Sequence, residues 1–192
     1  PTGAPSEVGD KPQLIDYRLR LDRSKAEWER MAPFPGGARS LVMGTVVAGK
    51  LYVFGGSLTD PEMRKIHVEL SEQFGLRAPY NGVPNYRDSY RYDPQSNEWN
   101  VLRSAPFPIV SGTPLAIDHR YILLMGSADF PTFRKGKTSE FVGINVKGGD
   151  SNIHWRGYGD RILCYHIAED KYSHVGVMPY GVATSHWVRT GN

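Results

Sequence analysis

The chain has 192 residues, of which 40% are apolar and 22% charged, a composition typical of folded globular proteins and not of disordered ones. Its 23 basic and 20 acidic residues are spread along the sequence, so the net charge of +3 does not indicate a nucleic-acid partner. A single cysteine, Cys164, rules out an intrachain disulfide and a thiolate metal cluster, and no apolar run is long enough for a membrane helix.

The first elements in chain order belong to a repeat. Aromatic anchors follow a polar residue by six positions in three places, Asp22/Trp28, Asp93/Trp99 and His166/Tyr172. A proline-containing link follows each anchor, namely APFP at 32–35, APFP at 105–108 and MPYG at 178–181. The spacing predicts four pieces of one repeating unit, at 14–31, 38–103, 111–178 and 182–192.

Two apolar segments that end in glycine predict the second strand of each complete unit. They are KLYVFGG at 50–56 and YILLMGS at 121–127. Glycine at the strand end permits backbone conformations that other residues rarely adopt. A long insert follows each segment, at 57–87 and at 128–158, before the next strand begins.

The two inserts predict different local structures. In the first, Asp60 is expected to cap a helix that Pro61 begins and Gly75 ends. Apolar residues lie on one face of that helix, at positions 63, 66, 70 and 74. The second insert predicts a hairpin, with EFVGINV and NIHWRGY on either side of the turn residues KGGDS.

The glycine-ending strand, the YDPQSNEW segment at 92–99 and the proline-rich link together resemble the kelch repeat, one blade of a β-propeller. The resemblance implies an all-β fold with two complete four-stranded blades, partial blades at both ends and long inserts between second and third strands. A propeller closes with four to eight blades, so the missing blades of a parent protein are expected as partners.

In a propeller of this type the inserts and the links between blades lie on one face, around the mouth of the central channel. Function on such a scaffold resides in the loops. Arginines bind carboxylates as a fork and aromatic rings stack on sugars, which favours a carbohydrate ligand. The residues predicted to bind it are Arg39, Arg87, Arg134, His154 and Trp155.

A narrower resemblance runs from YDPQSNEW through YILLMGSADFPTFR, which looks like the N-acetylneuraminate epimerase (sialic acid mutarotase) branch of bacterial kelch proteins. In that family a motif on the channel face supplies a glutamate and an arginine. Arg134 fits the arginine, Ser127 stands where the glutamate is expected, and Asp129 is the nearest carboxylate. The resemblance implies that Arg134 binds the sugar's carboxylate and that Asp129 or Glu140 transfers the proton, without a cofactor. It also slightly favours a periplasmic or secreted location.

Two other functions fit the kelch architecture. A protein-interaction propeller would bind a peptide with the same loops, and its site would be a broad, shallow ring instead of a deep funnel. A copper radical oxidase of the galactose oxidase type requires a cysteine–tyrosine crosslink with further tyrosine and histidine ligands. Cys164 lies in a predicted strand without those companions nearby, and the six histidines show no metal-ligand spacing, so no metal site is predicted.

Overall fold

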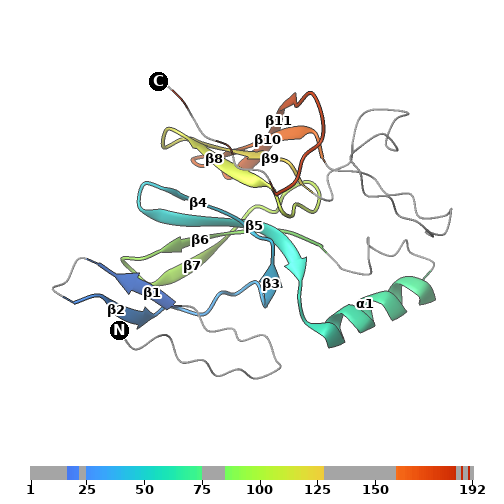
Figure 1. The fold of residues 1–192 in the computed structure, drawn as a ribbon, viewed down its shortest axis with the longest axis horizontal. Coiled ribbons are helices and arrows are strands. Elements are labelled where there is room, and N and C mark those ends of the chain that lie inside the picture. The colour runs from blue at the N-terminus through green and yellow to red at the C-terminus, as the bar shows by residue number, and fades with distance from the viewer. Residues whose placement is uncertain are drawn as a thin grey trace.

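The computed structural model describes residues 17–21, 25–74, 85–127, 159–184, 187 and 190. These residues form antiparallel strands and one helix (Figure 1). In chain order the elements are β1 (Tyr17–Arg20), β2 (Glu27–Arg30), β3 (Arg39–Ser40), β4 (Met43–Val47), β5 (Lys50–Leu58), α1 (Pro61–Gln73), β6 (Asn85–Asp93), β7 (Glu98–Leu102), β8 (Thr113–Ile117), β9 (Tyr121–Met125), β10 (Arg161–His166) and β11 (Lys171–Val177). The prediction of an all-β fold is confirmed.

The strands form three antiparallel sheets in which, apart from β3, consecutive strands of a sheet are neighbours. β1 and β2 form a two-stranded sheet, and β8 to β11 form a four-stranded one. The middle sheet has five strands, in the order β3-β5-β6-β7, with β4 also paired to β5. β3 and β4 occupy the same side of β5, because Ser40 pairs with Ser57 and Met43 with Phe54. The left-handed backbone of Leu41 (φ 56°) interrupts what is otherwise one strand.

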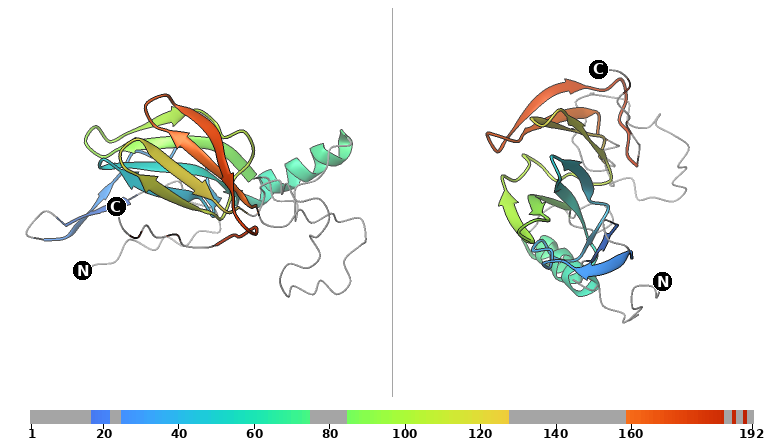
Figure 2. Two further views of the ribbon diagram at one scale, coloured as in Figure 1. Left: turned by 90° about the horizontal axis from the view of Figure 1, so that it is seen from above. Right: turned by 90° about the vertical axis from the view of Figure 1, so that its left-hand side faces the viewer.

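This up-and-down order gives the sheets two distinct ends. Short turns join β4 to β5, β6 to β7, β8 to β9 and β10 to β11 at one end, which we call the turn end. At the opposite end, which we call the loop face, β5 leads into α1, and the links 31–38 and 103–112 reach β3 and β8. Figure 2 shows α1 extending from this end of the sheets.

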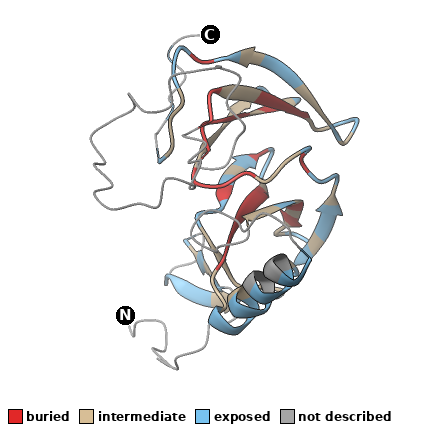
Figure 3. Ribbon diagram, turned by 90° about the vertical axis from the view of Figure 1, so that its right-hand side faces the viewer, coloured by how far each residue is buried: buried red, intermediate tan, exposed pale blue. Residues whose placement is uncertain are grey.

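The core lies between the two larger sheets. Tyr52 and Phe54 alternate along β5 on the face toward Tyr165 of β10, and the Phe54 and Tyr165 rings lie 5.6 Å apart, edge to face. The Ser89 and Tyr172 hydroxyls form a hydrogen bond of 2.6 Å across the same interface. Buried residues concentrate where these sheets face each other, whereas α1 is exposed (Figure 3).

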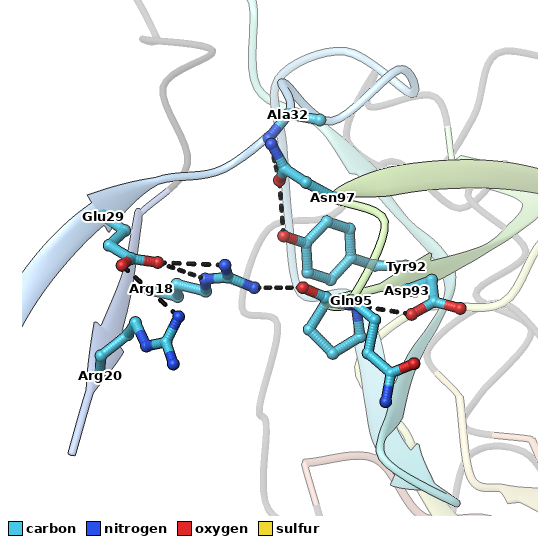
Figure 4. Close-up of polar contacts among 9 residues, drawn as sticks. Arg18, Arg20, Glu29, Ala32, Tyr92, Asp93, Gln95 and Asn97 are labelled. Carbon is cyan, nitrogen blue, oxygen red and sulfur yellow. Dashed lines mark hydrogen bonds and ion pairs between the residues drawn. The ribbon is translucent and has the colours of Figure 1, made fainter. Parts of the chain in front are cut away.

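The β1–β2 hairpin is fixed to the turn end of the middle sheet (Figure 4). Asn97, in the β6–β7 turn, accepts the backbone N–H of Ala32 at 2.9 Å and the Tyr92 hydroxyl at 2.7 Å. Arg18 pairs with Glu29 across the hairpin at 3.0 Å and donates to the Pro94 carbonyl at 2.7 Å. The hairpin thus lies against the middle sheet through contacts between residues far apart in the sequence.

The first insert contains the expected helix. Asp60 accepts the backbone N–H groups of Glu62 (2.9 Å) and Met63 (3.2 Å), which confirms the predicted cap, and Pro61 begins the helix. The apolar face of the helix is exposed: Met63 is 43% and Phe74 66% accessible. The predicted stop at Gly75 and the predicted hairpin in 128–158 lie outside the described residues.

Candidate functional site

The loop face of the middle sheet centres on Arg39, whose side chain is only 3% exposed. Its guanidinium meets Asp88 of β6 as a fork, Nη1 to Oδ1 at 2.6 Å and Nη2 to Oδ2 at 3.0 Å. It also donates to backbone carbonyls, from Nη1 to Gly55 at 3.0 Å, from Nε to Gly37 at 3.4 Å and from Nη2 to Gly36. All five guanidinium N–H donors therefore have protein acceptors.

Aromatic rings enclose the same guanidinium. Its central carbon lies 3.9 Å from the centre of the Tyr86 ring, 5.0 Å from that of Phe34 and 5.7 Å from that of Tyr90. A cation held against aromatic faces and excluded from water gains from cation–π attraction. The cluster Arg39, Asp88, Tyr86, Tyr90 and Phe34, which we call the arginine cluster, thus joins β3, β6 and the link before β3.

The tyrosines of the arginine cluster are held in their neutral form. Burial raises the pKa of Tyr90 to about 12, and its hydroxyl donates to Asp88 at 2.8 Å, which adds to the shift. Burial also raises the pKa of Tyr86, although the nearby Arg39 charge opposes this. Both phenols are therefore hydrogen-bond donors at neutral pH.

The ends of the first insert are tied together beside this cluster. The Ser57 hydroxyl, at the end of β5, donates to Asn85 Oδ1, at the start of β6, at 2.5 Å. Arg64 of α1 donates from Nε to the Leu58 carbonyl at 2.7 Å, which anchors the first turn of the helix to β5. The insert therefore leaves and rejoins the sheet at one fixed point.

The sheet β8–β11 presents a different set of groups at the same end. The Ser127 hydroxyl is buried and accepts the Val110 N–H at 3.0 Å. Asp160 is 2% exposed, and its Oδ1 has no hydrogen-bond partner in the part of the chain that the structure describes. Arg161 lies over the Phe107 ring at 5.5 Å, and burial lowers the pKa of its guanidinium.

The residues predicted to bind substrate fall into two groups. Arg39 and Arg87 both lie at the loop face; Arg39 is buried and fully bonded within the protein, whereas the Arg87 side chain is exposed and its carbonyl accepts the Ala105 N–H at 2.7 Å. The other predicted site residues lie outside the described residues and stay predictions: Asp129, Arg134, Glu140, His154 and Trp155.

Tyr90, Phe34 and Asp160 were not among the residues singled out from the sequence. A signal for Tyr90 exists, because Tyr86, Asp88 and Tyr90 alternate along β6 and so share one face of the strand. Phe34 lies in the APFP link that recurs at 105–108, whereas Asp160 carries no comparable pattern.

The described residues contain no group of three or more His, Cys, Asp and Glu side chains arranged to hold a metal ion. Cys164 is buried in β10, and burial raises the pKa of its thiol. Within the same ranges, no helix has the length and apolar character needed to cross a membrane.

Comparison with known proteins decides the family. The sequence profile of the N-acetylneuraminate epimerase family matches residues 12–192. The chain belongs to the N-acetylneuraminate epimerase family. An N-acetylneuraminate epimerase of Yersinia pestis (strain Pestoides F) is 31% identical over 92% of this chain. That of Haemophilus influenzae (strain 86-028NP) is 26% identical over 91% of it.

The fold of this epimerase-family chain has a known counterpart. The solved structure of YjhT, a β-propeller, superimposes with a TM-score of 0.60 and 22% sequence identity, covering 88% of this chain and 46% of YjhT. The chain spans 44% of the Yersinia relative and 40% of the Haemophilus one. It therefore corresponds to less than half of a family member, folded as kelch-type propeller blades.

Proposed function

We propose that the protein containing this chain interconverts the anomers of N-acetylneuraminate. The observation that carries the proposal is the family match over residues 12–192, supported by the relatives of that name. Because the chain spans less than half of those relatives, the activity is proposed for the whole protein.

The chemistry requires few groups. Anomer exchange opens and recloses the sugar ring, so a base must take the proton of the anomeric hydroxyl and an acid must protonate the ring oxygen. We assign the substrate's carboxylate to Arg134 and the proton transfer to Asp129 or Glu140. Arg87 is exposed at the loop face and is available to the same ligand, and His154 and Trp155 complete the proposed binding set.

The test is proton NMR of anomer exchange in N-acetylneuraminate with the full-length parent protein. We expect the wild type to accelerate exchange and Arg134→Ala to lose at least about 100-fold, the scale of a carboxylate anchor that orients the reacting centre. Arg120→Ala is the matched control, because Arg120 is 71% exposed and lies at the turn end.

A folded wild-type protein that does not accelerate exchange would contradict the proposal. The loop face would then be assigned to a binding propeller, and the search would turn to a protein or peptide partner.

A further inference from the structure

Arg39 contacts three segments that the sequence separates widely. Its guanidinium bonds to Gly36 and Gly37 in the link before β3, to Gly55 near the end of β5, and to Asp88 near the start of β6. Gly55 and Asp88 lie on either side of the first insert, which begins at the end of β5 and ends at the start of β6. One side chain thus fixes the link and both ends of the insert relative to one another.

These contacts leave Arg39 without a donor for a ligand. Its five N–H groups are bonded to protein acceptors, its central carbon lies over the Tyr86 and Phe34 rings, and the side chain is 3% exposed. A residue in this state acts on a ligand only by holding other groups in place.

We propose that Arg39, through its ion pair with Asp88, is a positioning residue for the loop-face sugar site, and that it does not bind the substrate itself. This inference rests on the function proposed above. It takes the place of the prediction from the sequence that Arg39 binds the substrate directly. Productive geometry at a catalytic site depends on supporting side chains that are themselves locked by packing and hydrogen bonds. Lysine cannot replace Arg39, because an ammonium is a point charge that lacks the planar fork.

The test is a double-mutant cycle in the full-length parent protein with Arg39→Lys, Asp88→Asn and the double variant. The rate of N-acetylneuraminate anomer exchange is measured well below the melting temperature of each variant. We expect each single change to lower kcat/KM by about tenfold, because misplaced groups lose catalytic efficiency. The double variant should lose little more, since both changes break one interaction. Arg120→Lys, at the exposed turn end, should leave the rate unchanged.

Two kinetic outcomes would overturn the proposal. If Arg39→Lys abolishes exchange while Asp88→Asn is harmless, Arg39 contacts the substrate directly. If both variants lower only the melting temperature and leave kcat and KM as in the wild type, the cluster is merely structural.

Amide hydrogen exchange provides a readout that does not depend on activity. Arg39→Lys should speed exchange several-fold at amides of residues 55–59 and 85–89, and Arg120→Lys should not. If the wild type shows no sugar turnover, the proposed function fails, yet this measurement still decides whether Arg39 fixes the ends of the insert. Unchanged protection in Arg39→Lys would refute that.

Discussion

Gly55 lies where the end of β5 meets the link that follows β7. Its backbone is left-handed (φ 55°), and a Cβ at this position would come within 1.9 Å of the Ile109 carbonyl oxygen. The neighbouring Gly56 N–H donates to the same carbonyl at 2.9 Å. In the next sheet Gly126 is left-handed as well, and the backbone N–H of Ser127 donates to the Val182 carbonyl at 3.0 Å. The glycine at the strand end therefore makes room for the link.

Gly55→Ala should consequently destabilise the parent protein by more than about 3 kcal/mol, because the backbone conformation and the collision act together. Gly44→Ala is the matched control: Gly44 is exposed in β4, and the nearest atom to an added Cβ is 3.8 Å away. We expect that control to stay within about 1 kcal/mol of the wild type. The denaturant midpoints of unfolding report the stability of both variants. Equal midpoints would show that the link shifts to make room for the added methyl group.

Asn97 offers a second test at the residue scale. Asp170 repeats its role in the next sheet, accepting the Arg103 N–H at 2.8 Å and the Tyr165 hydroxyl at 2.7 Å. A carboxylate therefore serves as well as an amide, and Asn97→Asp should be nearly neutral. Asn97→Ala should cost about 2–3 kcal/mol, because it leaves the buried Tyr92 hydroxyl unpaired and places alanine in a left-handed conformation. Thermal unfolding of the parent protein gives the melting temperature of each variant. Equal melting temperatures would show that this contact does not stabilise the protein.

At the scale of elements, α1 depends on its cap more than on packing. Its apolar face is exposed, with Ile66 at 44% and Leu70 at 45%, so burial contributes little to its stability. Asp60 caps the first turn by accepting its N–H groups, and the bond from Arg64 Nε to the Leu58 carbonyl ties that turn to β5.

Asp60→Ala should therefore weaken α1 by about 1 kcal/mol, which corresponds to about fivefold faster amide exchange in residues 62–66. Asp60→Ser keeps a side-chain oxygen at the cap and should restore most of the protection. Hydrogen exchange read by mass spectrometry resolves this difference. Equal exchange in the two variants would mean that the cap does not limit opening of the helix.

The elements could be predicted from the sequence because each carries a local pattern. The side chains of a strand such as KLYVFGG point alternately to two faces that are both buried. The helix has a capping residue, followed by apolar residues at helical spacing. In the arginine cluster the alternation of Tyr86, Asp88 and Tyr90 along β6 is a local pattern, but the bonds of Arg39 follow none. Three of the acceptors of Arg39 are backbone carbonyls, which exist at every residue, and it is the fold that brings the Gly55 carbonyl to it. A candidate arginine could be predicted, but its bonding could not.

At the scale of the whole molecule, the β1–β2 hairpin is antiparallel, as β6–β7 is, but lacks the same burial. Leu19 pairs with Trp28 and Tyr92 with Trp99, with eight residues between the first pair and six between the second. Yet Leu19 is 40% and Trp28 51% exposed, whereas Tyr92 is 3% exposed. The hairpin and the link after it cover the face of the middle sheet, through contacts such as Phe34 against Trp99 at 4.9 Å. The hairpin's own outer face has no such cover among the described residues.

The relatives are more than twice as long as this chain, so we expect a further blade of the parent protein to cover Leu19. Leu19→Asp in the full-length protein should then cost about 2–4 kcal/mol, because it buries an unpaired carboxylate. Val101→Asp is the matched control, since Val101 is 74% exposed on β7 and should lose less than about 1 kcal/mol. Urea unfolding of both variants gives the comparison. A Leu19→Asp variant as stable as Val101→Asp would mean that this flank faces solvent in the complete propeller and that the ring closes without contact at the hairpin.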